Sequence, residues 1–485
     1  MASVDQRIVV PTRRVHRPTD ARVNRVELYF LPVATRIPLK FGSETLTTVT
    51  CARVRIQLLD RHGRTAEGWG ETPLSVQWAW PSSLSLAERH LAMVEFCKQL
   101  AEAWMQYESW GHPLETGNAF QRDILEPLTD EFNEGRDPGA QMPHLAALVC
   151  CSAFDIALHD AYGALHEVPV YKTYNSQYMS CDLADFMSPA PDAQVNFRGQ
   201  HPANYLTAEP TRSLPVWHLV GGLDPIDPSE VADSQPQDGY PVLLSDWIKR
   251  DGLYCLKIKL RGDDAAWDYN RLVRVGQIGR SNGVKWLTAD FNCTVQEPAY
   301  VNEILDRLER DEPQIFGMIL HVEQPFAYDL EEQTIDVRSV AQRKPLFMDE
   351  SAHNWRYIKL GQSLGWTGVA LKTCKTQTGA ILSLCWARAH EMSLMVQDLT
   401  NPMLAQIPHV TLAAHSRTIM GVESNAMQFY PDASSFEAQV HPGVYSRRDG
   451  KLDLSTITGP GFGYRAGEIT RRFRPPLRLL ASAPG

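Results

Sequence analysis

The chain has 485 residues, more than one hydrophobic core normally supports, so two domains, or one large barrel with an appendage, are expected. Its 47 basic and 57 acidic residues give a net charge of -10, which argues against nucleic acid or a membrane as a partner. The nine cysteines lack the spacing of a disulfide framework or a zinc site, and no apolar run is long enough to cross a membrane. We therefore expect a soluble cytoplasmic protein.

Residues 1–20 read as an N-terminal arm. Apolar residues that alternate from Val23 to Thr72 then predict an antiparallel meander, and small and apolar residues at helical spacing continue to about Glu167. This order predicts an α+β domain over residues 21–174. Residues 175–213 are rich in proline and have little periodicity, so we expect an irregular insertion there.

Eight short apolar runs follow at intervals of roughly 30 residues, the length of one strand with its crossover helix. They are centred near Val216, Lys257, Asp290, Glu323, Asp349, Lys372, Asp398 and Glu423. Eight such units predict an α/β fold, a (β/α)8 barrel of the TIM type, regular or modified, over residues 214–445. An open doubly wound sheet is the alternative, but GGLDP after the first run is no glycine-rich phosphate loop. Residues 446–485 are expected to pack back on the α+β domain.

Three consecutive strands end in a carboxylate, at Asp290, Glu323 and Asp349. Catalytic groups of such barrels lie at the carboxyl ends of the strands, so these acids should converge at one mouth. Clustered carboxylates repel one another unless a cation neutralises them, and an all-oxygen set favours Mg²⁺, with Mn²⁺ as the alternative. For one acid alone we would prefer a salt bridge or a loop cap; for all three together a metal site is favoured.

Lys257 and Lys259 share the inward face of the second strand, and Lys372 ends the sixth strand, roughly opposite. A neighbouring lysine and a metal would each shift an amine towards its neutral, basic form. One lysine could take the α-proton of a carboxylate substrate, leaving an enediolate, while the other returns a proton or holds charge on the opposite face. Lys375 is expected to be a loop cation.

Together, the motifs KIK (257–259), DFN (290–292), EQP (323–325), DES (349–351) and LKTCK (371–375) resemble the enolase superfamily. Within its mandelate racemase/muconate lactonizing enzyme family, the resemblance is to the muconate-lactonizing-enzyme-like group. It covers most of the chain, because the N-terminal meander resembles the family's capping domain, whose loop at residues 38–48 would lie over the barrel mouth.

The resemblance implies roles for six residues, a Mg²⁺ cofactor and a homo-oligomer. It makes Asp290, Glu323 and Asp349 the metal ligands, Lys259 and Lys372 the acid/base pair, and Lys257 a neighbour that tunes Lys259.

The chain also departs from the family pattern. TQTG at 376–379 replaces a glycine pair, and GVESN at 421–425 stands where dipeptide epimerases have an aspartate pair, so a dipeptide substrate is not favoured. Candidate substrate-binding residues are Asn292, Asp398, Glu423 and Asn425. Asp398 could instead orient Lys372 or close the ring of charges, and Glu423 could equally cap a helix.

These patterns predict an enzyme that uses Mg²⁺ to abstract the α-proton of a small carboxylate substrate, with racemisation or epimerisation of an amino acid derivative or a related acid as the outcome. Cycloisomerisation and syn or anti elimination (a dehydratase) begin with the same step and are the alternatives. Two other classes of function are less favoured. A metal-dependent hydrolase would usually have several histidines at the strand ends, where this chain has carboxylates and lysines. In a catalytically silent scaffold, the buried charges would lower stability without serving a reaction.

Overall fold

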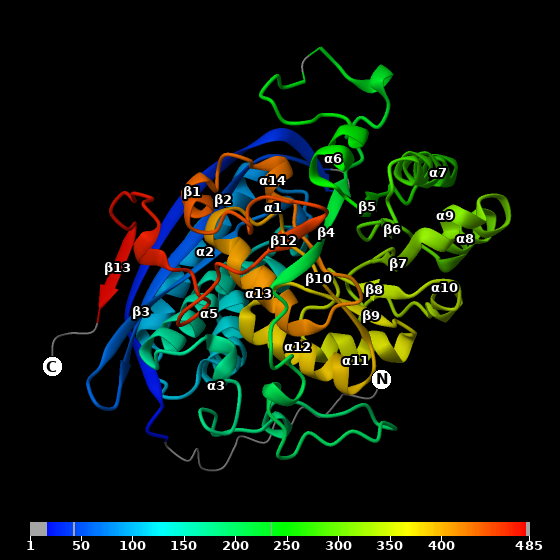
Figure 1. The fold of residues 1–485 in the computed structure, drawn as a ribbon. Helices are drawn as coiled ribbons and strands as arrows, with labels where there is room; N and C mark the ends of the chain where they lie inside the picture. The colour runs from blue at the N-terminus through cyan, green and yellow to red at the C-terminus, as the bar shows by residue number, and fades with distance from the viewer. Residues whose placement is uncertain (1–16, 42–43, 234, 482–485) are drawn as a thin grey trace.

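The computed structural model describes residues 17–41, 44–233 and 235–481, and most of the N-terminal arm, residues 1–16, lies outside the described residues. An antiparallel sheet with its helices stands beside a curled parallel sheet that helices surround (Figure 1). The strands of the antiparallel sheet, in spatial order, are β13 (Arg478–Ala481), β1 (Ala21–Phe41), β2 (Glu44–Asp60) and β3 (Thr65–Pro73). The predicted meander is therefore present, with a fourth strand from the C-terminal segment at its edge.

Five helices belong to this N-terminal part: α1 (Val76–Ala79), α2 (Leu86–Gln106), α3 (Pro113–Phe120), α4 (Glu126–Asn133) and α5 (His144–Leu165). A π-helical turn at Gln121–Leu125 joins α3 to α4. Helix α2 begins at a capping box, in which Ser85 accepts from the backbone of Glu88 and the Glu88 carboxylate accepts from Ser85.

Helix α5 lies directly against β3, because two glycines allow the close approach. A Cβ atom at Gly68 would stand 2.0 Å from the backbone nitrogen of Ala161, and one at Gly70 would stand 2.0 Å from the carbonyl oxygen of Ala153. The expectation that no apolar run is long enough to cross a membrane is wrong for Pro138–Leu165, which contains α5 and meets that condition by length and composition. However, 89% of its apolar window is buried inside the protein. It therefore forms the core of the N-terminal part.

The parallel sheet confirms the predicted barrel fold. Its strands in chain order are β4 (Ser213–Val220), β5 (Cys255–Lys259), β6 (Trp286–Asp290), β7 (Ile319–Glu323), β8 (Leu346–Met348), β9 (Gly368–Leu371), β10 (Ser393–Val396) and β11 (Val422–Glu423). Each strand from β4 to β9 pairs in parallel with the next, and β11 pairs with β4.

The ring is modified where it closes. Within the described residues no ladder joins β10 to β11, although the N–H of Ile419, just before β11, donates to the carbonyl of Leu394 in β10 at 2.7 Å. A short strand from the C-terminal segment, β12 (Lys451–Asp453), pairs antiparallel with β4. The barrel is therefore a curled eight-stranded sheet whose last junction depends on single contacts.

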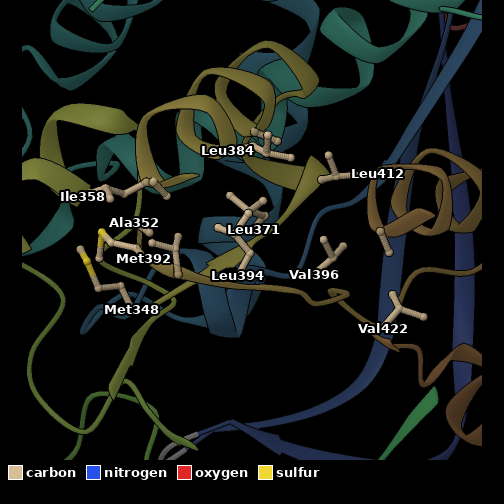
Figure 2. Packing of buried hydrophobic residues seen from close by; sticks show 14 of the residues in the cluster. Met348, Ala352, Ile358, Leu371, Leu384, Met392, Leu394, Val396, Leu412 and Val422 are labelled. Carbon is tan, nitrogen blue, oxygen red and sulfur yellow. The ribbon is translucent and has the colours of Figure 1, made fainter. Parts of the chain in front are cut away.

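Helices fill the connections between the strands. They are α6 (Leu244–Asp251), α7 (Ala265–Ser281), α8 (Pro298–Asp311), α9 (Pro313–Met318), α10 (Arg338–Ala341), α11 (Trp355–Leu364), α12 (Gln377–Ala389), α13 (Gln406–Ser416), α14 (Ala426–Phe429) and α15 (Ser435–Val440). Figure 2 shows how they pack: Leu371, Leu394 and Val396 of β9 and β10 meet Leu384 of α12 and Leu412 of α13. This packing fixes the positions of the strand ends.

The segment expected to be a loop at residues 38–48 is instead the tip of the β1–β2 hairpin; residues 42–43 lie outside the described residues. Leu39 pairs with Leu46, and both are buried against Leu219 of β4 and Phe429 of α14. Burial of this apolar pair explains why strand pairing continues here, and it places the hairpin against the mouth of the barrel.

Candidate active site

The charged strand ends meet at the carboxyl edge of the parallel sheet, because the register of the strands aligns them. Lys259 is the ladder neighbour of Asp290, and Asp290 is the ladder neighbour of Glu323. Asp349 follows directly after β8, and Lys372 follows directly after β9. All five side chains are buried.

Lys257 lies at the centre of this cluster. Its ammonium nitrogen is 3.1 Å from Oδ2 of Asp290, 2.7 Å from Oε1 of Glu323 and 2.9 Å from Oε2 of Glu423. Burial alone would lower the pKa of Lys257, but the charges of these three acids outweigh it and raise that pKa well above its ordinary value. The surrounding acids thus favour the protonated form of Lys257, and its shift towards the neutral form, which depends also on the charge of a metal, stays a prediction.

Lys259 makes the closest lysine contact to Asp290. Its Nζ atom lies 2.5 Å from Oδ2 of Asp290. Burial by itself would raise the pKa of Asp290, but the positive charges of Lys257 and Lys259 lower it well below its ordinary value. Asp290 is therefore held as a carboxylate between two amines.

Lys372 approaches the cluster from the other side of the barrel. Its Nζ atom lies 3.2 Å from Oδ2 of Asp349 and donates to the carbonyl oxygen of Asp398 at 3.0 Å. Burial would lower the pKa of Lys372, but the charge of Asp349 outweighs it, and the net shift is upward rather than towards the neutral form.

Lys375 is not the loop cation that was expected. It is buried, and its Nζ atom contacts both the carbonyl oxygen and the Oδ1 atom of Asp349. Burial lowers the pKa of Lys375 despite this neighbour. Lys375 ends a 3-10 turn after β9, Thr373–Lys375, and from there it reaches Asp349.

Helix α5 holds the segment that carries these two lysines. Ser152 donates to the carbonyl of Thr373 at 2.7 Å, and the Asp155 carboxylate accepts from the N–H and hydroxyl of Thr378 at 2.8 and 2.7 Å. Between them, Thr376 has a φ of 72°, a left-handed conformation that is strained for a β-branched residue. Its hydroxyl accepts from Gly379 N–H and caps α12, so the N-terminal part of the chain positions the loop behind Lys372.

Three further residues of the cluster were missed from the sequence. Trp78 of α1 donates to Oε1 of Glu350 at 2.9 Å, and its ring lies 5.2 Å from the Lys372 amine. Burial, with the charges of Asp349 and Asp290, raises the pKa of Glu350 to about 7. Gln397 donates to Oε2 of Glu323 at 2.5 Å.

The sequence contains a clue to Glu350 but none to Trp78. Glu350 stands inside the DES motif, but side-chain alternation would turn it away from Asp349 if the strand continued. Strand β8 ends at Met348, so alternation no longer applies at Glu350. No pattern in the sequence connects Trp78 with the barrel.

The candidate substrate-binding residues divide into two groups. Asn292 donates to Oε1 of Glu350 at 3.1 Å and lines a cavity of about 500 Å³ that also reaches Lys259. Asn425 instead donates to two carboxylates: its backbone N–H to Oδ2 of Asp398 at 2.8 Å, and its side-chain amide to Oε1 of Glu423 at 2.8 Å. Asp398, Glu423 and Asn425 thus connect the ends of β10 and β11.

The charge balance fits a divalent cation. Six buried carboxyl groups stand near four buried amines: Asp290, Glu323, Asp349, Glu350, Asp398 and Glu423 against Lys257, Lys259, Lys372 and Lys375. The carboxyl groups outnumber the amines by two, and the all-oxygen donor set suits Mg²⁺ or Mn²⁺. Among the described residues no three His, Cys, Asp or Glu side chains form a ready metal-ligand group, since lysine amines lie between the acids.

Comparison with known proteins agrees with the fold. Residues 242–468 match the family described as enolase C-terminal domain-like. The L-Ala-D/L-Glu epimerase from Bacillus subtilis superposes with a TM-score of 0.57 and 20% identity, over 91% of this chain and 98% of that chain. The muconate lactonizing enzyme from Mucobacterium smegmatis superposes with a TM-score of 0.59 and 16% identity, over 91% and 96%.

A dipeptide epimerase from Enterococcus faecalis V583, complexed with Mg and the dipeptide L-Leu-L-Tyr, gives a TM-score of 0.57 at 15% identity, over 91% of this chain and 99% of that chain. A curated protein, type II secretion system protein M of Pectobacterium carotovorum subsp. carotovorum, is 33% identical over 84 residues. That match covers 16% of this chain, which spans about half (51%) of the curated protein, so it carries no functional argument.

Proposed function

Because this chain belongs to the enolase superfamily, in its mandelate racemase/muconate lactonizing enzyme family, we propose that it abstracts the α-proton of a carboxylate substrate with the help of Mg²⁺. The product of that step is an enediolate, and the proposed outcome is racemisation or epimerisation of an amino acid derivative or a related acid. The observation that carries the proposal is the pair Lys259 and Lys372, on opposite sides of a buried ring of acids.

The strand order supports a two-sided reaction. Lys259 ends β5 and Lys372 follows β9, and these strands are four places apart in a sheet of eight. Lysines at opposite points of the ring can reach opposite faces of one carbon. Lys259 would remove the proton from one face, and Lys372 would deliver a proton to the other.

The proposed ligands for the cation are Asp290, Glu323 and Asp349. When bound, the cation would supply positive charge next to the substrate carboxylate, where negative charge develops as the α-proton leaves. The Mg-complexed dipeptide epimerase of the same fold is in line with this assignment. Lys257, which contacts Asp290 and Glu323, would orient these two acids and favour loss of the Lys259 proton by its own charge.

The test is α-proton exchange followed by NMR in D2O, with Mg²⁺ and pooled N-acyl amino acids, dipeptides and hydroxy acids. We expect loss of an α-proton signal in one pool, and that signal names the substrate class. Deuterium at the same carbon with inversion of its configuration indicates racemisation, whereas loss of a leaving group or ring closure indicates elimination or cycloisomerisation. A Lys259→Ala protein that exchanges both faces at the normal rate would falsify the role of that lysine.

Two further proposals accompany the activity. The first is a cytoplasmic location, which is supported by the nine cysteines, all free thiols, because a reducing compartment keeps thiols unpaired. A homo-oligomer is proposed from the family alone, and sedimentation of the purified protein tests it.

A further inference from the structure

A cavity of about 500 Å³ lies beside Lys259 at the mouth of the barrel. Lys40 of β1 and Arg261, two residues after β5, are part of its wall, together with Asn292. A substrate whose reacting carbon lies at Lys259 can extend into this space. The cavity is therefore where the part of the substrate far from the reacting carbon would lie.

This cavity carries unbalanced positive charge. Lys259 is paired with Asp290, but within the described residues the Lys40 amine and the Arg261 guanidinium make no hydrogen bond or ion pair. The one acid in the described wall is Asp263, which is exposed to solvent, as is Arg261. Two cations therefore face the cavity without an anionic partner.

The surrounding structure orients the Arg261 side chain and positions the backbone of Lys40. The Arg261 guanidinium lies over the ring of Trp267, 4.1 Å from its centroid. Lys40 follows Leu39, which is buried against the barrel, so alternation along β1 turns Lys40 to the other face of the hairpin.

Four residues before Lys40, Arg36 anchors the same strand to the loop after β4. Its guanidinium contacts Oδ2 of Asp238 at 2.6 Å and donates to the carbonyls of Tyr240 and Pro241 at 2.9 and 3.1 Å. The hairpin that carries Lys40 is therefore tied to the barrel by contacts that do not use Lys40 itself.

The wall of the cavity also contains apolar side chains. Leu223, Leu260 and Trp267 also line the cavity, and Leu223 is 53% exposed, high for a large apolar residue. An exposed leucine beside a binding cavity can contact a methylene segment of a ligand. The wall thus combines an apolar surface with cations.

We propose that Lys40 and Arg261 form an anion subsite and that the substrate carries two carboxylates, one at the reaction centre and a second, beyond an apolar segment, at these cations. The inference rests on the proposed function, which places the reacting carbon at Lys259. A carboxylate bound by two cations gains charge-assisted hydrogen bonds that its neutral amide lacks.

The experiment uses N-acyl amino acids in matched forms that differ only at the far end of the acyl chain, a carboxylate or its primary amide. Calorimetry with Mg²⁺ present measures their affinity, and NMR in D2O measures α-proton exchange. We expect the carboxylate form to bind at least about tenfold more tightly, a free-energy difference of about 1.4 kcal/mol. The Lys40→Met/Arg261→Met double variant should lose that preference.

The matched control is Arg280→Met/Lys285→Met, which removes the same charge from exposed residues before β6, at the other end of the barrel, and should keep the preference. Lys40→Arg/Arg261→Lys keeps the charge and should also retain it, which excludes a folding defect as the cause. Equal affinity for the two forms, or a preference that survives in the double variant, overturns the subsite.

The two proposals can fail separately. Exchange of both forms at similar rates and affinities supports the proposed function and overturns the anion subsite. A preference for the carboxylate form that depends on Lys40 and Arg261, without exchange of any compound, supports the subsite and counts against the proposed chemistry.

Discussion

Two buried charged clusters of this protein differ in how their charges are matched. In the first, at the junction between the two parts of the chain, Arg53 contacts Glu71 and lies 3.5 Å from Glu437, which Arg471 also contacts at 2.6 Å. Two arginines thus neutralise two glutamates. In the second, at the barrel mouth, six carboxyl groups outnumber four lysine amines.

The choice of cation is as informative as the count. Arginine stays protonated in proteins, so the junction cluster can connect segments but cannot exchange protons. Lysine loses its proton more readily, and an excess of carboxylates leaves room for a divalent cation. We infer that balanced arginine pairs mark a structural contact here, while the unbalanced lysine cluster marks the site of chemistry.

The largest effect that tests this comparison is expected at Lys259. Lys259→Met should reduce α-proton exchange by about 10²–10⁴-fold, the usual contribution of a general base. Thermal unfolding of the variant should stay cooperative, since the change removes one charge from a cluster with several. Rates are measured by NMR in D2O, and an unchanged exchange rate would contradict the assignment.

Next in size is the loss of stability on breaking the junction. Arg53→Met should lower the free energy of unfolding by about 3–5 kcal/mol, because Glu71 is then buried without its partner. Chemical denaturation measures this change. Mg²⁺ affinity, measured in parallel by calorimetry, should be unaffected; a loss of Mg²⁺ binding would show that the two clusters are not independent.

Asp160 is a buried acid outside both clusters, and the pH dependence of stability tests its role. Among the residues that the structure describes, Asp160 has no cationic partner. It accepts the N–H groups of Trp69 and Phe462 at 2.9 and 2.8 Å, and burial raises its pKa to about 7. The pKa of Asp160 is higher in the folded than in the unfolded protein. Its contribution to the free energy of unfolding is therefore complete below the unfolded pKa and is lost as pH rises through the folded pKa.

From this group, the free energy of unfolding should therefore fall by about 2 kcal/mol between pH 5 and 7. Asp160→Asn should flatten that slope even if it lowers stability overall. Denaturation curves at several pH values provide the measurement. An equal slope in the two proteins would mean that other groups cause the pH dependence.

The smallest expected effect concerns the cation. Glu323→Gln should weaken Mg²⁺ binding by at least about tenfold, because loss of even an indirect partner of a metal costs that much. The stabilisation that Mg²⁺ gives to the wild-type protein in thermal unfolding should shrink accordingly. Arg53→Met, the matched control, should keep it; full Mg²⁺ stabilisation of the Glu323 variant would remove that residue from the ligand set.

The prediction of the fold from the sequence is confirmed for particular reasons. Strand and helix periods are local properties, so eight apolar runs near Val216 to Glu423 were enough to predict the barrel. Runs that end in charge, such as LTADFN and HVEQPF, also indicated which residues share the mouth. The metal-ligand and acid/base roles of these residues stay predictions, because the structure shows their positions and not their reaction.

Contacts between distant segments could not be predicted in this way. Trp78 reaches Glu350 across 272 positions of the chain, and Ser152 reaches Thr373 across 221. The hairpin tip near Lys40 was mistaken for a loop, because its pairing depends on burial against the barrel.

Residue type and spacing were sufficient to establish the barrel, the capping sheet and the ring of acids and lysines. The pairing of each lysine with a particular acid, the burial of Lys375 and the cavity between Lys40 and Arg261 arise only when distant segments pack together. The physical reason is that strand period is encoded in neighbouring residues, whereas the pKa of a side chain and its exposure to substrate depend on every segment that surrounds it.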